Sequence, residues 1–135
     1  MKQIIVLHEP ADKIQSPEDL FMRIQRIDID YDREHFLEFT LNTKNQIIGT
    51  HIISIGILDA SLIHPRETFR KAILDNAKSI IVAHNHPSGS LTPSQNDVEI
   101  SHALVKAGDI LGIPVLDHIV FNRIEFLSLK NHGDF

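Results

Sequence analysis

A short apolar segment, followed by a polar loop and a long amphipathic helix, constrains the fold of this chain more than any other feature. Residues Ser79 to Ala83 form an apolar run, which is typical of a strand buried in the centre of a sheet. From Ser94 to about Leu111, apolar residues recur at helical spacing, and Gly112 is placed to end that helix. A buried strand that leads into a covering helix indicates a layered α/β domain.

The first half of the chain supplies a helix and a pair of strands. A helix is expected after Ser16, because a Ser cap is followed by Pro at the first helical position and then by acidic residues. Glu34 to Leu41 alternates as a strand, and Gln46 to Ile55 follows across turn-forming residues as its antiparallel partner. Lys2 to Leu7 predicts a further short strand.

The second half continues the alternation of helices and strands. Pro65 suits the first turn of another helix, and Ile113 to Phe121 predicts a last strand region, interrupted by Pro114. The apolar stripe of the helix that begins at Pro65 is expected to be Phe69, Ala72, Ile73 and Ala77.

The length of 135 residues fits one domain, and the sequence contains no repeat, low-complexity tract or long linker. We therefore predict a single domain over residues 1–135. Within it, residues 1–15 would be an N-terminal extension, residues 16–129 the core, and residues 130–135 a loose polar tail.

The composition restricts both the location and the partners of the protein. The chain has no cysteine, which suits a reducing compartment and leaves histidine and carboxylates as the ligands for any transition metal. No segment approaches the roughly 20 apolar residues of a membrane span, and Ile4 to Leu7 is too short for the core of a signal peptide. We expect a cytoplasmic protein without a membrane partner. The net charge of −5 makes nucleic acid an unlikely direct partner.

Histidine is abundant, with nine residues, and two of them lie where the buried strand ends. His84 and His86 are two positions apart, a spacing that turns both rings to the same side of a strand. Asp97 follows in the first turn of the next helix, one turn from Ser94. Two imidazoles and one carboxylate with an open fourth position are the ligand set of a catalytic zinc site, so one Zn²⁺ per chain is expected. By itself, Ser94-x-x-Asp97 is also an ordinary capping box.

Hydrolysis at such a site also needs a base and a donor for the developing oxyanion. Ser94, one turn from Asp97, can serve as the donor. The base should be a carboxylate on a neighbouring element. Glu34, at the start of the first long strand, is the preferred residue, and Glu38 is the second choice because its side chain points away from the face of Leu37 and Phe39.

The run His84-x-His86, then seven residues, then Ser94-x-x-Asp97 resembles the JAMM motif of the JAB/MPN metallopeptidases. The wider sequence resembles the RadC-type branch of that superfamily from about Ser16 to Leu129. The blocks that carry this resemblance are Arg33-Glu34-His35-Phe36, Leu41-Asn42-Thr43-Lys44-Asn45, His64-Pro65-Arg66-Glu67, His84 to Gly89, Pro93-Ser94 and Leu116-Asp117-His118.

The resemblance implies a deaminase-like three-layer α/β/α sandwich with a mixed sheet. It also implies zinc on His84, His86 and Asp97, with Glu34 as general acid and base in the hydrolysis of a peptide or isopeptide bond. The expected partner is then a peptide or an isopeptide-linked protein. RadC-type proteins often carry an N-terminal helix-hairpin-helix module, and this chain is expected to lack it.

Two alternatives to an amide hydrolase remain open from the sequence. Other zinc chemistry on a similar fold, such as deamination, normally uses cysteine ligands, which this chain does not have. A non-catalytic, zinc-containing interaction module in DNA repair or mobile-element biology is the other alternative. Salt-dependent binding to random duplex DNA would support that module.

Overall fold

A five-stranded mixed sheet organises the computed structural model, which describes residues 13–56 and 63–135. The strand order is β2-β1-β3-β4-β5. β1 (His35–Leu41) is antiparallel to β2 (Ile47–Ile55) and to β3 (Ser79–Asn85). β3 is parallel to β4 (Val115–Phe121), and β5 (Phe126–Ser128) returns antiparallel to β4. β3 therefore lies in the middle, and all seven of its residues are buried.

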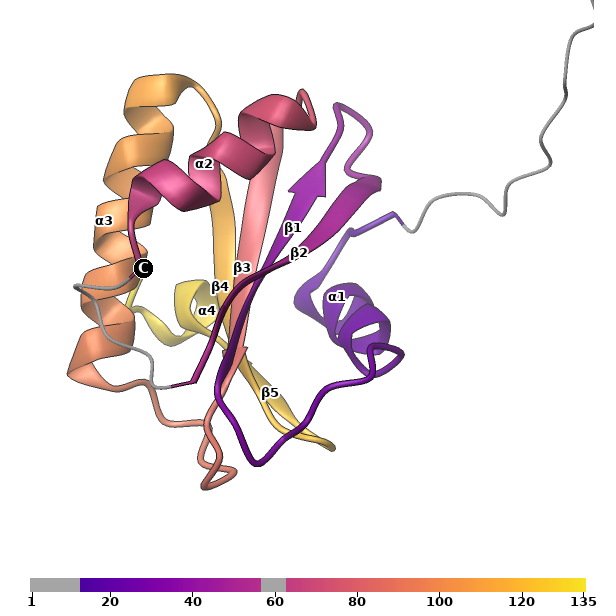
Figure 1. The fold of residues 1–135 in the computed structure, drawn as a ribbon, viewed down its shortest axis with the longest axis vertical. Coiled ribbons are helices and arrows are strands. Elements are labelled where there is room, and N and C mark those ends of the chain that lie inside the picture. The colour runs from indigo at the N-terminus through magenta and orange to yellow at the C-terminus, as the bar shows by residue number, and fades with distance from the viewer. Residues whose placement is uncertain (1–12, 57–62) are drawn as a thin grey trace, which may run out of the picture.

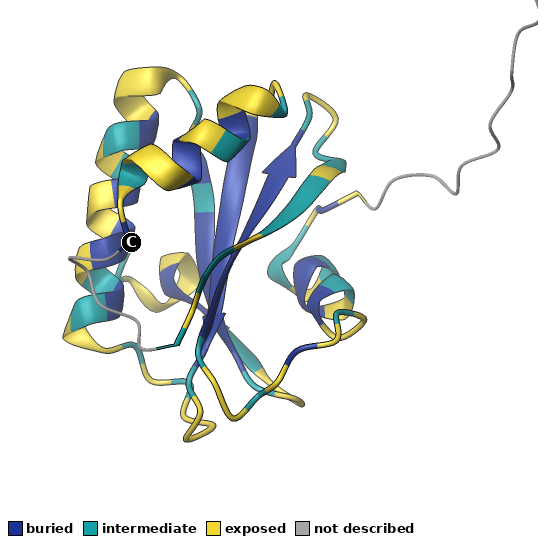
Figure 2. Ribbon diagram, in the orientation of Figure 1, coloured by how far each residue is buried: buried dark blue, intermediate teal, exposed yellow. Residues whose placement is uncertain are grey.

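Helices cover both faces of this sheet (Figure 1). α1 (Pro17–Ile24) packs on one face, where Leu20, Phe21 and Ile24 meet the apolar residues of β1, β3 and β4. α2 (Pro65–Leu74) and α3 (Gln95–Leu111) cover the opposite face and enclose a second apolar cluster. Figure 2 shows the buried residues along the sheet and on the inward sides of the helices. The predicted three-layer α/β/α sandwich with a mixed sheet is confirmed.

Alternation along β1 divides its side chains between the two clusters. Leu37, Phe39 and Leu41 face α1, as the sequence pattern predicts, and Phe36 faces α2 and α3. In the antiparallel register Phe36 lies opposite His84, so His84 also points to the α2 and α3 side. The histidine at the end of β3 is thereby turned towards the helix that follows it.

Local sequence signals explain where α3 begins and ends. The side chain of Ser94 caps the helix by accepting the backbone N–H of Asp97, and Gly112 ends it in the left-handed region at a φ of 72°. The predicted helix from Ser94 to Leu111 is confirmed, with Ser94 as its cap. No helix of the described residues is long and apolar enough to cross a membrane.

Three expectations need correction or lie outside the structure. Ile73 is 58% exposed, so it does not belong to the buried stripe of α2. The loose tail expected from Lys130 is wrong for its first residues, because α4 (Leu129–His132) follows β5 directly and Asp117 accepts the backbone N–H of Lys130. The strand expected at Lys2 to Leu7 lies outside the described residues, and the division into extension, core and tail stays a prediction.

Candidate metal centre

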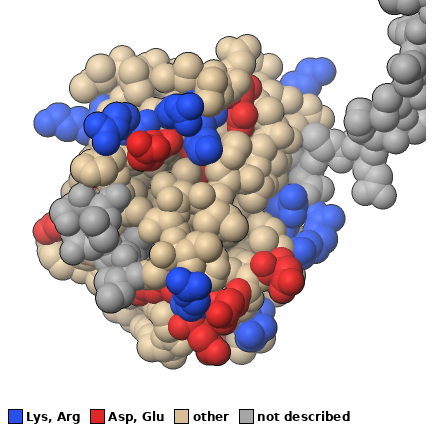
Figure 3. All heavy atoms as spheres, viewed as in Figure 1, with Lys and Arg blue, Asp and Glu red and all other residues tan. Residues whose placement is uncertain are grey.

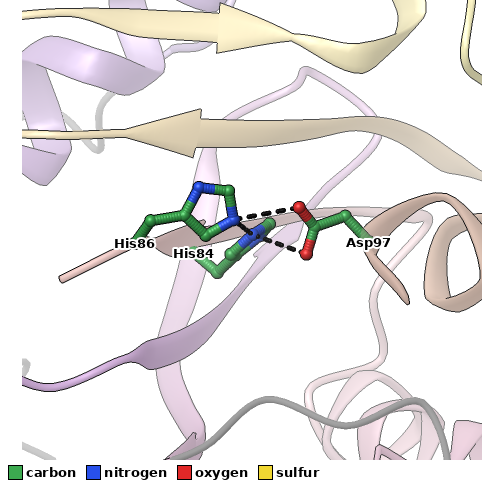
Figure 4. Close-up of side chains that lie close together, drawn as sticks. All are labelled: His84, His86 and Asp97. Carbon is green, nitrogen blue, oxygen red and sulfur yellow. Dashed lines mark hydrogen bonds and ion pairs between the residues drawn. The ribbon is translucent and has the colours of Figure 1, made fainter. Parts of the chain in front are cut away.

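The end of β3 and the start of α3 bring three metal-binding side chains together (Figure 4). His84 is still within β3, His86 lies just beyond it, and Asp97 is in the first turn of α3. The Nε2 atoms of His84 and His86 are 3.0 Å apart. Oδ1 of Asp97 lies 2.9 Å from Nε2 of His84, and Oδ2 lies 3.0 Å from Nε2 of His86. These are the three residues that the sequence analysis proposed as a group, and their role as metal ligands stays a prediction.

Burial differs across the group and gives the site one accessible side. The His84 side chain has no exposed surface and that of Asp97 has 2%, whereas that of His86 is 14% exposed. A hollow of about 400 Å³ adjoins His86 on this side. It is lined by Tyr31, Asp32, His86, Pro87, Ser88, Gly89, Asn122, Arg123 and Ile124. Of the three candidate ligands, only His86 borders this hollow.

The contacts of His86 leave its Nε2 either to hold a proton or to bind a metal ion. Nδ1 of His86 lies 2.8 Å from the carbonyl oxygen of Ser90, which can only accept, so Nδ1 must carry the proton. In the neutral ring, Nε2 then presents a lone pair to a carboxylate oxygen of Asp97 3.0 Å away. Two acceptors at that distance repel each other unless a proton or a metal ion lies between them.

The donor set fits zinc. Zinc accepts imidazole nitrogen and carboxylate oxygen at about 2.0–2.2 Å, and tetrahedral geometry then separates the ligand atoms by roughly 3.3 Å. The three ligand atoms of His84, His86 and Asp97 lie within 4.8 Å of one another, close enough to surround one ion. With three protein ligands, a bound zinc ion would keep a fourth position for water or substrate.

The ionisation of the group is consistent with a metal site. Burial by itself would raise the pKa of Asp97, but the contacts with His84 and His86 outweigh it and hold that pKa well below its usual range. The contact with Asp97 raises the pKa of His86, although burial opposes the change. Asp97 is thus a carboxylate at neutral pH, as a metal ligand must be.

Ser94 and Asp97 form the capping box that the alternative interpretation predicted. The Ser94 backbone N–H donates to Oδ2 of Asp97 at 2.7 Å, and the Asp97 N–H donates to Oγ of Ser94 at 3.1 Å. This reciprocal pair fixes the carboxylate that faces the two histidines. Since Oγ acts as the acceptor, the hydroxyl hydrogen of Ser94 can still be donated. Its role as oxyanion donor stays a prediction.

Glu34 lies immediately before β1, half-buried, and its charge contributes to the raised pKa of His86. The residues on both sides of it are held by Asn85. The side chain of Asn85 accepts the N–H of His35 at 2.8 Å and donates to the carbonyl oxygen of Arg33 at 2.9 Å. The preferred base is therefore brought towards the three ligands by the residue between two of them.

Glu38 occupies a different place. It is fully buried on β1, opposite Val82 and His51, and neither carboxylate oxygen has a hydrogen-bond partner in the described part of the chain. Burial, with the nearby charge of Asp75, raises the pKa of Glu38 to about 8. Neither Glu38 nor Glu34 belongs to the possible metal-binding group found among the described residues, and the choice of Glu34 over Glu38 as the base stays a prediction.

The sequence interpretation missed the residues that support the ligands. Nε2 of His118 lies 2.7 Å from Nδ1 of His84, and the opposite ring nitrogen contacts Oγ of Ser101. The sequence analysis names His118 only within the block Leu116-Asp117-His118, which gives no indication of its contact with His84. Ser101 stands four residues after Asp97 on the buried side of α3, and that spacing is the one signal that could have identified it.

Comparison with known proteins agrees with this geometry. A family model described as "RadC-like JAB domain" matches residues 14–134. A UPF0758 protein of Desulforamulus reducens is 49% identical over 120 residues, which cover 89% of this chain and 53% of that protein. A UPF0758 protein of Methanosarcina mazei is 41% identical over 127 residues, covering 94% of this chain and 56% of the relative.

The chain spans about half the length of these curated relatives, and the name UPF0758 states no activity. The match includes Glu34 and the three candidate ligands, His84, His86 and Asp97. The chain belongs to the RadC-like JAB domain family.

Proposed function

We propose that this protein is a zinc-dependent hydrolase of amide bonds, of the metallopeptidase or isopeptidase type. The observation that carries the proposal is the convergence of Nε2 of His84, Nε2 of His86 and the Asp97 carboxylate, with the His86 side chain partly exposed. Glu34 nearby supplies the carboxylate that a hydrolase needs and a purely structural zinc site does not.

His84, His86 and Asp97 would hold the zinc ion. When bound, zinc acts as a Lewis acid and lowers the pKa of a water molecule from 15.7 to roughly 7. The chain contributes the fixed positions of the ligands: the Ser90 carbonyl sets the ring of His86, and the capping box sets the carboxylate of Asp97.

Glu34 would take the proton of the attacking water and deliver it to the leaving amine, which requires one carboxylate to act first as base and then as acid. Ser94 would donate its hydroxyl hydrogen to the substrate carbonyl oxygen as negative charge develops there. Asn85 holds the backbone on both sides of Glu34, so this segment need not be ordered when substrate arrives.

The substrate is proposed to be a peptide or an isopeptide-linked protein that occupies the hollow beside His86. Nucleic acid is a poor candidate, because the formal net charge is −5 and the face in Figure 3 shows acidic and basic side chains interspersed at its rims. The absence of cysteine fits a cytoplasmic setting. The accessible side of the site argues against a purely structural role for zinc.

Zinc content tests the metal part of this proposal. Purified wild type should contain one zinc per chain, and His86→Ala and Asp97→Ala should lose it. A wild type that takes up no zinc at neutral pH would overturn the proposal.

Activity is then measured on fluorogenic peptides and lysine-linked isopeptides. Glu34→Gln should retain zinc and lose hydrolysis, because the amide cannot accept the proton. Full activity of a zinc-loaded Glu34→Gln protein would rule out Glu34 as the base and return Glu38 to consideration.

A further inference from the structure

His118 lies directly behind the metal-binding group. It is fully buried on β4, next to β3, and its Nε2 is 2.7 Å from Nδ1 of His84. Its Nδ1 contacts Oγ of Ser101 on α3. Each ring nitrogen of His118 thus has one partner, and the chain of contacts runs from His84 through His118 to Ser101.

Metal binding would fix the direction of this chain of hydrogen bonds. If Nε2 of His84 ligates the ion, Nδ1 of that ring carries the proton and must donate it to an acceptor. The atom in reach is Nε2 of His118, which must then be unprotonated. The remaining proton of neutral His118 lies on Nδ1 and is donated to Ser101.

We infer that His118 is a positioning residue that, with Ser101, fixes the tautomer and ring orientation of His84 for metal binding. The inference rests on the proposed zinc site. Ligating histidines generally donate their second N–H to a carboxylate, a backbone carbonyl or water, and loss of that partner weakens metal binding. In this protein the imidazole of His118 would be the acceptor of that hydrogen bond.

The surroundings of His118 favour a neutral hydrogen-bond acceptor at this position. The ring of Phe36 stacks on His84 at 6.4 Å between centroids and meets His118 edge-on at 5.8 Å. A carboxylate in this apolar position would place a second buried negative charge behind the ligand group that already contains Asp97. An imidazole accepts the proton of His84 without that charge.

The contacts of His84 and His118 begin and end on the same helix, α3. Ser101 stands four residues after Asp97, so both side chains lie on the buried side of the same helix. His84 contacts Asp97 on one side and reaches Ser101 through His118 on the other. β3, β4 and α3 are therefore tied together at the ligands, and a shift of His118 would change the position of His84 relative to Asp97.

Zinc affinity, measured by competition with a chelator, separates this role from general support of the fold. His118→Leu removes the acceptor and should weaken zinc binding about 10–100-fold, whereas His118→Gln, whose amide oxygen can accept from His84, should stay within roughly threefold of wild type. Ile119→Ala is the control, because Ile119 is equally buried on β4 but faces the α1 side. It should lower thermal stability in the metal-free state and leave zinc affinity unchanged.

Nitrogen-15 NMR of histidine in the zinc-loaded wild type provides a second readout that needs no variant. His118 should be neutral with its proton on Nδ1. A proton on Nε2, or on both nitrogens, would overturn the inference even if His118→Leu fails to fold.

The possible failures are distinguishable. A wild type that binds no zinc overturns the proposed function itself and this inference with it. Tight zinc binding by folded His118→Leu, or an equal loss in His118→Leu and His118→Gln, overturns the positioning role alone.

Discussion

The side chain of Asn85 holds the backbone of His35, with Oδ1 accepting the N–H at 2.8 Å across fifty residues of sequence. Its Nδ2 donates to the carbonyl oxygen of Arg33 at 2.9 Å. Because Asn85 stands between His84 and His86, the residue that separates two ligands also fixes the segment that carries Glu34. One side chain therefore links the backbone around Glu34 to the segment that carries His84 and His86.

Replacing Asn85 with Ala should reduce hydrolysis more than it reduces metal binding. The substitution leaves the buried His35 N–H without a partner and should lower the free energy of unfolding by about 1–3 kcal/mol. Zinc content should stay at the wild-type value, because neither histidine nor Asp97 is changed. Asn42→Ala is the matched control, since Asn42 makes similar contacts to Lys44 and Gln46 in the β1–β2 turn. Equal losses of activity in both variants would contradict the role of Asn85.

Asp97 has two tasks, capping α3 and facing the two histidines, and Asp97→Asn should separate them. The amide oxygen can still accept the N–H of Ser94, so in the presence of a chelator this variant should be more stable than Asp97→Ala by about 1 kcal/mol. Zinc binding should be lost in both, because the negative charge is gone. Urea unfolding and chelator competition measure the two effects. Wild-type zinc affinity in Asp97→Asn would show that the carboxylate only caps the helix.

Much of this site could be predicted because its signals are local. His84, His86, Ser94 and Asp97 lie within fourteen consecutive residues, and strand spacing and a helix cap are enough to bring them together. The limits of α3 follow from Ser94 and Gly112 in the same way. Glu34 lies far away in sequence, and its choice depended on the family resemblance as well as on its place before a strand.

The missed features depend on contacts between distant segments. His118 meets His84 only because β3 and β4 pair in parallel with Val82 opposite His118, a register that the sequence does not reveal. α4 is four residues long, too short to be stable on its own. It forms where Asp117, in β4, accepts hydrogen bonds from Ser128 and Lys130, so the sequence signal at Lys130 indicated only a polar tail.

Zinc should stabilise the folded protein strongly. An ion that binds only the native state raises the free energy of unfolding by about 4 kcal/mol when its free concentration is 1,000 times the dissociation constant. Thermal unfolding with and without a chelator measures this gain. His86→Ala should unfold at the same temperature with and without the chelator. If zinc raised the unfolding temperature of that variant, the ion would bind at a site other than His84, His86 and Asp97.

Glu38 should make the protein less stable as the pH rises, independently of the metal centre. Its pKa is raised from 4.5 to about 8 in the folded state, so between these values the unfolded chain loses a proton that the folded protein keeps. The stabilisation is fully present below pH 4.5 and is lost as the pH rises through about 8. Over that interval the free energy of unfolding should fall by up to about 1.4 kcal/mol for each step of one in pH. Asp75 contributes to stability in a different pH range. Burial by itself would raise its pKa, but the contacts with His51 and Thr40 outweigh burial and lower it. The stabilisation from Asp75 is therefore lost only as the solution becomes acidic.

Glu38→Gln should therefore flatten the stability profile between pH 4.5 and about 8, and should be more stable than wild type at the upper end. Glu99→Gln, on the exposed side of α3, is the control and should keep the wild-type slope. Urea unfolding at several pH values, with a chelator present so that metal loss does not contribute, gives both slopes. An unchanged slope in Glu38→Gln would mean that the buried carboxyl is not the group that retains the proton.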